Sequence, residues 1–144
     1  NFAGIKYTFE SIYEYNQCRL YKDGKFDMLH GQDETILPSL AMGGARGGIG
    51  GTTNYNGREL TAIIDCWNKG ELEAAREHQN FSQEVINVIC RYRGNIVGGK
   101  RIMKLIGLDL GKNRTPFQNL TDEEEQAMKR ELEAIGFFDR CNVL

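Results

Sequence analysis

Three short strand-like segments alternate with helical segments near the start of this chain, and that alternation constrains its fold more than any other feature. Apolar and small residues predict strands over 2–8, 26–30 and 45–50. Apolar side chains at helical spacing predict the intervening helices, over 9–20, 35–42 and 58–67. Strands that alternate with helices on short connections form a parallel sheet with right-handed crossovers. The sequence therefore predicts an α/β fold.

Beyond Gly70 the pattern becomes wholly helical. Apolar and half-apolar residues recur at helical spacing over 71–92, and a shorter helix is predicted over 99–106. The last helix carries the capping box Thr121-Asp122-Glu123-Glu124 before it and Gly136 at its C-terminal end. We therefore expect three βα units in residues 1–69 and a C-terminal helical extension in residues 70–144.

Three parallel strands with helices on one side leave two unpaired edges and cannot close on themselves. A TIM (β/α)8 barrel usually needs about 250 residues, whereas this chain has 144 and does not begin with methionine. We interpret the chain as the last three βα units of such a barrel, followed by the helical tail. The N-terminal barrel strands are then absent from this chain.

Composition excludes several classes of function. The net charge of -2 provides no basic surface for nucleic acid, and no apolar run is long enough to span a membrane. The chain shows no secretory signal, so we expect a cytoplasmic protein. The four cysteines are far apart in sequence and the chain has only two histidines, which predicts reduced thiols and no metal site.

Chemically distinctive residues follow the predicted strands. Function in such sheets collects at the carboxyl ends of the strands, where Lys6 and Thr8, the loop 31–34 and the loop 51–54 would share one rim. Because side chains alternate along a strand, Lys6 would face the barrel interior if Ile5 and Tyr7 pack under the helices. A desolvated lysine supplies a free amine that can form a Schiff base with a carbonyl.

Other interpretations of these residues stay open. Lys6 could instead form an ion pair with Asp33 or Glu34. The two acids could bind hydroxyl groups of a substrate, or cap and charge the first turn of the helix predicted from Thr35, and both roles can coexist. The glycine-rich stretch 43–51 lacks the spacing of a phosphate-binding loop, so we expect it to allow close approach of a backbone or ligand.

Several motifs at these intervals carry a resemblance to a known family. The stretches "GIKYT" at 4–8, "GQDE" at 31–34 and "GGIGGTTN" at 47–54 resemble the last three strands of the N-acetylneuraminate lyase branch of the dihydrodipicolinate synthase superfamily. The resemblance continues through "GKRIMKLIGL" at 99–108 and "RTPF" at 114–117, and so covers essentially the whole chain.

The resemblance implies a class I aldolase that cleaves the sialic acid N-acetylneuraminate to N-acetylmannosamine and pyruvate without a metal or other cofactor. Lys6 would form the Schiff base with the substrate ketone, and Thr8 would lie beside the imine. Gly31, Asp33 and Glu34 match positions that bind the hydroxylated tail of the sugar. A homo-oligomer, a tetramer in the family, is also implied.

This chain departs from the family pattern at two positions and in its extent. Relatives often carry Ser where this chain has Gly51, so a hydroxyl contact to the sugar tail is lost or replaced by backbone or water. Ile96 falls where an aromatic residue often lines the pocket. The family's carboxylate-binding threonine loop and catalytic tyrosine come from earlier strands. The resemblance therefore implies an enzyme that is competent only with the rest of the barrel, in cis or as a separate chain.

Two alternatives remain beside this reading. One is a related pyruvate-dependent aldolase, or a dihydrodipicolinate-synthase-like enzyme, that acts on another 2-keto acid. The other is a half-barrel interaction protein without catalytic activity. Retention of Lys6 together with Thr8, Asp33 and Glu34 argues against an interaction protein, because a scaffold gains nothing from a buried amine.

Overall fold

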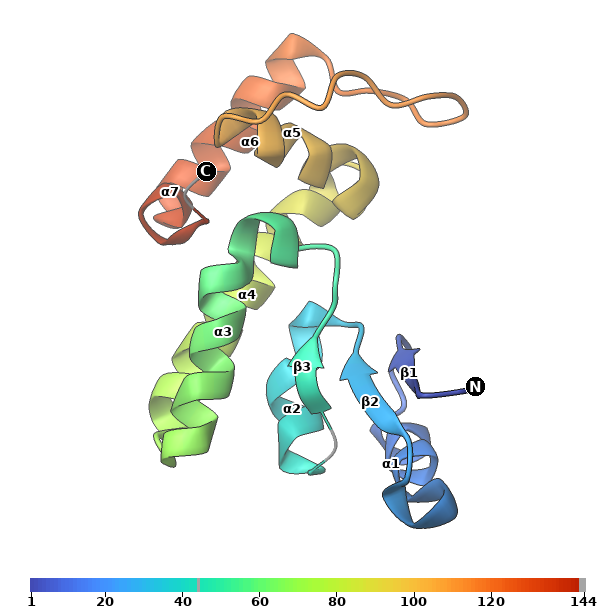
Figure 1. The fold of residues 1–144 in the computed structure, drawn as a ribbon. Coiled ribbons are helices and arrows are strands. Elements are labelled where there is room, and N and C mark those ends of the chain that lie inside the picture. The colour runs from blue at the N-terminus through green and yellow to red at the C-terminus, as the bar shows by residue number, and fades with distance from the viewer. Residues whose placement is uncertain (44, 143–144) are drawn as a thin grey trace.

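The computed structural model describes residues 1–43 and 45–142 and contains three strands and seven α-helices within them (Figure 1). The strands are β1 (Gly4–Tyr7), β2 (Asp27–His30) and β3 (Ala45–Gly48). The helices are α1 (Ile12–Leu20), α2 (Ile36–Ala41), α3 (Thr53–Lys69), α4 (Leu72–Arg91), α5 (Lys100–Leu105), α6 (Asp122–Ala134) and α7 (Phe137–Arg140). Short helical turns lie at η1 (Tyr21–Gly24), η2 (Asp33–Thr35) and η3 (Asn95–Gly99).

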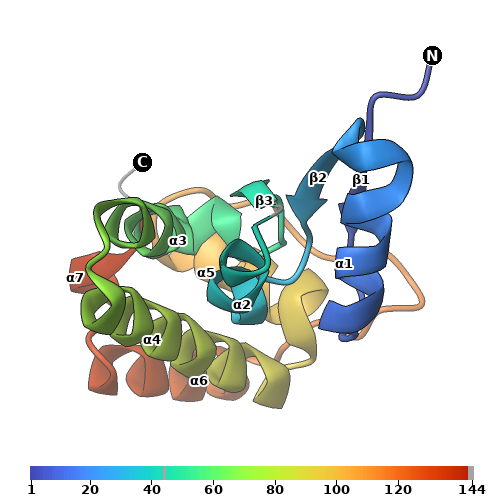
Figure 2. The ribbon, with the colours of Figure 1, turned by 90° about the horizontal axis from the view of Figure 1, so that it is seen from below.

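The sheet has the predicted parallel topology. Its strands lie in the order β1-β2-β3, and both neighbouring pairs are parallel. Figure 2 shows α1 and α2 on the same side of the sheet. No helix of the described residues covers the opposite face, where Lys6 lies beside Leu29 in the register of β1 and β2. This open face corresponds to the interior of the expected barrel.

The covered face of the sheet has a small apolar cluster of its own. Tyr7, Tyr15 and Met28 are buried together, and the rings of Tyr7 and Tyr15 meet edge to face at 5.5 Å. The alternation predicted for β1 therefore holds at Tyr7. Ile5, the other residue of that alternation, is 41% exposed at the free edge of β1.

Most of the core lies in the helical tail. A second small cluster joins α2 to α3 through Ile36, Leu40, Leu60 and Ile63. The largest cluster connects α3, α4, η3, α5, α6 and α7; its residues are Tyr55, Phe81, Val85, Val88, Ile89, Val97, Ile102, Met103, Leu120, Met128, Leu132, Phe137 and Cys141. The helices therefore form the main body against which the sheet is held.

Helix boundaries differ from the predictions at two places. Helix α3 begins at Thr53, whereas the sequence predicted a helix from residue 58. The backbone N–H of Thr52 donates to the Asp33 carboxylate at 2.8 Å, so an acceptor from another loop stabilises the start of this helix despite Gly57. The capping box of α6 is confirmed, with both the Thr121 and Glu124 bonds present, whereas the four-residue helix α7 was not predicted.

A buried carboxylate joins α3 to the end of the chain. Glu59 in α3 accepts hydrogen bonds from Arg140 Nε at 2.9 Å and shares one with His78 Nδ1 at 2.7 Å. The Arg140 guanidinium also lies 3.7 Å from the centre of the Phe81 ring. Burial works to raise the pKa of Glu59, but the bonds from Arg140 and His78 outweigh it, so the pKa lies below its ordinary value.

We predict that Arg140→Ala destabilises the protein by about 2 kcal/mol, because it leaves the Glu59 charge buried without its main partner. The loss is smaller than for a fully buried pair, since the Arg140 side chain is 37% exposed. Arg76→Ala is the matched control: it breaks an exposed ion pair with Glu73 and should cost about 0.5 kcal/mol or less. Denaturant unfolding measures both, and equal effects would contradict the assigned role of Arg140.

The same cluster predicts a dependence of stability on pH. The pKa of Glu59 is lower in the folded state than its ordinary value, so its stabilising contribution is present at neutral pH. That contribution is lost as the pH falls through the folded-state pKa. The difference in unfolding free energy between the protein and Glu59→Gln should therefore shrink between about pH 6 and about pH 3. A difference that stays constant over this range would contradict the prediction.

Candidate functional site

The carboxyl ends of β1 and β2 bring Lys6, Thr8 and Gly31 together. The backbone N–H of Gly31 donates to the Tyr7 carbonyl at 2.7 Å, which holds the two strand ends side by side. A Cβ at position 31 would overlap Thr8 Oγ1 and lie 2.9 Å from Lys6 Cε. Gly31 therefore leaves the space that the lysine and threonine side chains occupy.

Lys6 lies on the uncovered face of the sheet, as the alternation predicted, but it is exposed in this chain. The expected desolvation is absent because no other element of the described residues covers that face. The alternative ion pair is not observed either. Within residues 1–43 and 45–142, Lys6 forms no salt bridge with Asp33 or Glu34. The amine is therefore accessible at the rim.

Asp33 is buried and connects two loops. Its Oδ2 accepts from the Thr52 backbone N–H at 2.8 Å and from Thr52 Oγ1 at 2.6 Å. Its Oδ1 is buried and has no hydrogen-bond partner among the described residues. One interpretation of the sequence expected Asp33 to cap α2. In the structure Asp33 caps the start of α3 instead. One carboxylate oxygen thus joins the two loops, and the other is buried without a partner among the described residues.

Helix α4 holds the loop that carries both acids. Gln79 Nε2 donates to the Asp33 carbonyl at 3.0 Å, and Gln79 Oε1 accepts from the Leu37 backbone at 3.0 Å. Gln83 Nε2 donates to the Glu34 carbonyl at 2.8 Å. The half-buried Glu34 side chain has no hydrogen-bond partner in the described part of the chain. The helical tail therefore positions the loop through backbone carbonyls, and the Glu34 carboxylate takes no part in these hydrogen bonds.

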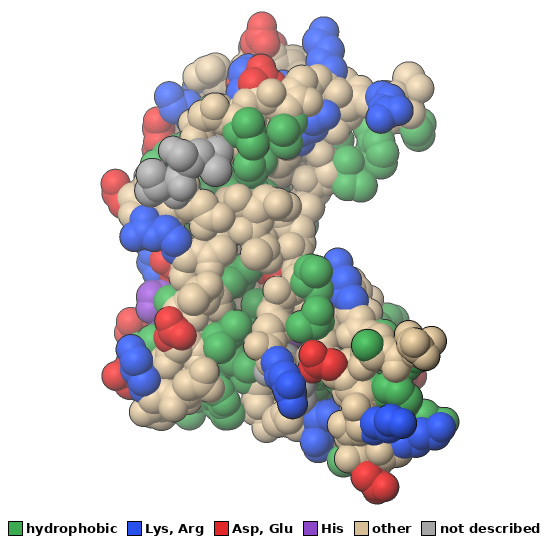
Figure 3. Space-filling model, in the orientation of Figure 1, with side chains coloured by type: hydrophobic (Ala, Val, Ile, Leu, Met, Phe, Trp, Pro, Cys, Tyr) green, Lys and Arg blue, Asp and Glu red, His purple; other side chains and the backbone are tan. Residues whose placement is uncertain are grey.

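Gly51 and Ile96 meet at a cavity of about 300 Å³ between the start of α3 and the helical tail. Asn95 and Tyr55 also line it, and the Tyr55 hydroxyl donates to Asn95 Oδ1 at 2.7 Å. Figure 3 shows that the surface is deeply indented on one side, between the helical tail and the sheet. The predicted site residues thus lie in two groups on one rim, the first around Lys6 and the second around this cavity.

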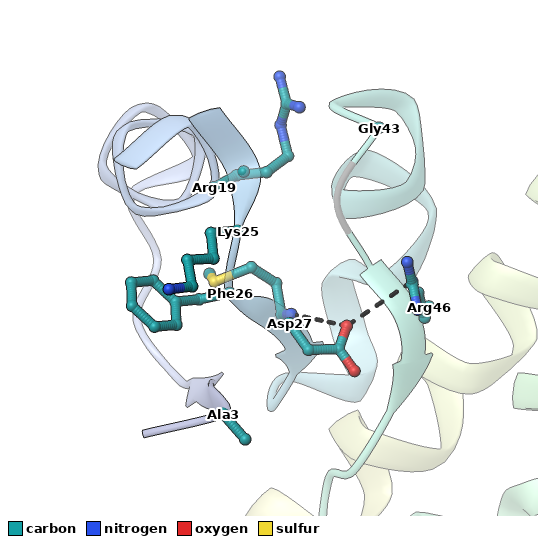
Figure 4. Close-up of a pocket in the computed structure, with 9 residues that line it drawn as sticks. Ala3, Arg19, Lys25, Phe26, Asp27, Gly43 and Arg46 are labelled. Carbon is teal, nitrogen blue, oxygen red and sulfur yellow. Dashed lines mark hydrogen bonds and ion pairs between the residues drawn. The ribbon is translucent and has the colours of Figure 1, made fainter. Parts of the chain in front are cut away.

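A different pocket lies at the amino ends of the strands. It has a volume of about 270 Å³ and is lined by basic side chains that include Arg19, Lys25 and Arg46 (Figure 4). Asp27 starts β2 there and lies 3.8 Å from Arg46 Nε. Because this pocket is at the opposite end of the strands from Lys6, it is not part of the candidate site.

His30 lies beneath the candidate site without belonging to a metal centre. It is fully buried, its Nε2 lies 2.7 Å from Thr35 Oγ1, and burial lowers its pKa against the opposing influence of Asp33. Within residues 1–43 and 45–142, no three His, Cys, Asp or Glu side chains gather as metal ligands would. No helix there has the length and apolar character needed to cross a membrane.

The roles of three residues that support the site were not predicted from the sequence. Thr52, Gln79 and Asn95 each contact a candidate site residue or its loop, yet no local pattern marks them. Thr52 stands next to Gly51 and Asn95 next to Ile96, so closer attention to the neighbours of the two departures from the family pattern could have found both. Gln79 occupies the buried face of α4, where a polar residue suggests a specific partner.

Comparisons with known proteins agree with this architecture. N-acetylneuraminate lyase of Mus musculus is 29% identical over 99% of this chain and 45% of its own length, and that of Rhizobium meliloti (strain 1021) is 32% identical over 90% and 42%. The solved structure of Proteus mirabilis N-acetylneuraminate lyase matches with a TM-score of 0.87 at 30% identity, over 94% of this chain and 45% of that chain.

The chain thus spans less than half the length of these relatives. Its three parallel βα units and helical tail are the C-terminal portion of a TIM (β/α)8 barrel, which confirms the predicted fold class. The Dihydrodipicolinate synthetase family matches residues 1–135. This chain therefore belongs to the dihydrodipicolinate synthetase family.

Proposed function

We propose that this chain supplies the Schiff-base lysine and part of the sugar pocket of a class I aldolase that cleaves N-acetylneuraminate. The observation that carries the proposal is the position of Lys6, at the carboxyl end of β1 on the uncovered face of the sheet, beside Thr8 and the bare backbone of Gly31. The relatives named N-acetylneuraminate lyase support this choice of substrate.

The chemistry follows from the lysine amine. The Lys6 amine attacks the C2 ketone of the open-chain substrate, water leaves, and a protonated imine forms. Loss of the proton on the C4 hydroxyl lets the C3–C4 bond break, with its electron pair drawn into the imine as an enamine. N-acetylmannosamine leaves as the aldehyde. Protonation of the enamine at C3 and hydrolysis of the imine then release pyruvate and restore the amine, without an external cofactor.

The two acids account for a hydroxylated substrate. Asp33 Oδ1 is buried without a partner among the described residues, and such an oxygen normally accepts a hydrogen bond. A substrate hydroxyl would satisfy it, while Thr52 keeps Oδ2 in place. Glu34 offers a second carboxylate on the same loop. Thr8 stands beside the imine, and Gly51 and Ile96 line the far end of the pocket.

We further propose that the active form contains the remaining barrel strands, in cis or as a separate chain. An apolar hollow of about 540 Å³, lined by Phe2, Ile5, Tyr21 and Phe26 among others, borders the free edge of β1. A neighbouring strand and helix would bury these side chains and cover Lys6. In this arrangement residues 1–69 complete the barrel and residues 70–144 extend it, in a cytoplasmic homo-oligomer, a tetramer, with reduced cysteines.

The proposed role of the lysine can be tested by trapping. Borohydride reduction of the complete barrel with pyruvate should add one reduced pyruvate to Lys6, detected by intact mass and peptide mapping, because borohydride traps the imine. Lys6→Ala should give no adduct and no lyase activity. Lys25→Ala removes an exposed lysine at the opposite end of the strands and should leave both unchanged. No adduct on Lys6 in a complete barrel would refute the aldolase proposal.

A further prediction concerns Gly31. In Gly31→Ala the added methyl group must displace Thr8 and Lys6, so we expect kcat/KM to fall about tenfold to hundredfold. Gly47→Ala is the matched control, because its methyl group would lie 3.9 Å from Leu29 Cδ2, an ordinary contact, and it should retain most of the activity. Thermal unfolding of both variants separates a local displacement from a loss of folding, and similar activities would contradict the prediction.

A further inference from the structure

The amide of Asn95 occupies the space where a side chain at position 51 would lie. A Cβ on Gly51 would overlap Asn95 Nδ2 and lie 2.6 Å from its Cγ. Asn95 belongs to η3, far along the chain from the loop that follows β3, so this contact exists only in the folded protein. The amide of Asn95, which comes from a different element, therefore packs against the bare backbone of Gly51.

Tyr55 fixes the orientation of this amide. The Tyr55 side chain is 1% exposed, and its hydroxyl donates to Asn95 Oδ1 at 2.7 Å. Burial raises the pKa of Tyr55, so the hydroxyl stays protonated and remains a donor. A Cβ at position 99 would lie 2.6 Å from Asn95 Oδ1, so Gly99 also clears space for the pair. Two glycines and one tyrosine therefore define where the amide lies.

The remaining half of the amide is a free donor. With Oδ1 held by Tyr55, Asn95 Nδ2 has no hydrogen-bond partner in residues 1–43 and 45–142. The residue is exposed and borders the cavity of about 300 Å³ that also contains Gly51 and Ile96. An amide whose oxygen is held by a buried hydroxyl, and whose nitrogen lies at a cavity, is oriented to donate to an oxygen of a ligand.

The cavity lies on the rim where a long substrate attached to Lys6 would end. Gly51 follows β3 and Lys6 ends β1, so two strand spacings, about 10 Å, separate them across the sheet. The Asp33 loop follows β2 between them. A substrate that is bound to Lys6 through its ketone and extends past Asp33 would bring its far end to Asn95.

We propose that Asn95 is a specificity-determining residue whose Nδ2 donates a hydrogen bond to a hydroxyl oxygen at the far end of a long polyhydroxylated 2-keto acid. Tyr55 is its positioning residue. This inference rests on the proposed function, since it assumes that the substrate is attached at Lys6. It predicts that the enzyme prefers long substrates over short ones that undergo the same aldol reaction.

The experiment compares two substrates in the complete barrel. For Asn95→Ala, kcat/KM with nine-carbon N-acetylneuraminate should fall about five- to tenfold, mainly through a higher KM, as expected for one lost hydrogen bond. The value for a six-carbon 2-keto-3-deoxy acid, whose tail is too short to reach the cavity, should not change. Asn87→Ala, at an exposed asparagine of α4, is the matched control and should leave both values unchanged.

Two further variants test the positioning by Tyr55 and Gly51. Tyr55→Phe removes the hydroxyl that orients the amide, and the double variant with Asn95→Ala should lose no more than Asn95→Ala alone. Gly51→Ala should displace the amide and give the same selective loss for the nine-carbon substrate. Additive losses in the double variant, or equal losses for both substrates, would overturn the role assigned to Asn95.

Borohydride trapping separates this inference from the proposed function. If pyruvate is trapped on Lys6 in Asn95→Ala as in the unaltered protein and the loss is confined to the long substrate, both proposals are supported. If trapping succeeds and neither substrate is affected by Asn95→Ala, the role of Asn95 is refuted while the lysine chemistry stands. If the unaltered complete barrel traps no pyruvate, the proposed function fails, and the inference that rests on it fails too.

Discussion

The burial of Asp33 is the constraint on which the arrangement of this rim depends. A carboxylate removed from water must receive hydrogen bonds, and here Thr52 supplies two of them to one oxygen. The Asp33 carbonyl is held in turn by Gln79 from α4. One residue therefore connects the loop after β2, the first turn of α3 and the helical tail. The positions of these three segments cannot change independently of one another.

The glycines of the rim follow from this arrangement. A Cβ at Gly31 would overlap Thr8, one at Gly50 would overlap the Asp33 carboxylate, and one at Gly51 would overlap the amide of Asn95. In each case the space belongs to a polar side chain from elsewhere in the chain. For the glycine-rich stretch, the sequence suggested close approach of a backbone or a ligand. It could not show that the approaching groups are side chains of the protein itself.

The residues that could be predicted are those whose environment is local. Alternation along β1 predicts the face on which Lys6 lies, and the capping box of α6 is defined by four consecutive residues. The start of α3 could not be predicted, because it depends on an acceptor 19 residues earlier in the chain. The contact between Gln79 and Asp33 spans 46 residues and has no local pattern. These two features thus depend on tertiary contacts, which local helix propensity cannot predict.

The position of β1 links assembly to chemistry. The helical tail has the largest apolar cluster and holds the loop after β2, while α2 and α3 share another cluster. Within the described residues, strand β1 pairs only with β2, has α1 on one face, and leaves Ile5 exposed at its free edge. It also carries Lys6. The strand that carries the amine is therefore paired along one edge only in the described part of the chain. On the function proposed above, covering the apolar edge of β1 would both fix that strand and remove water from the lysine, so completion of the barrel would also activate the amine.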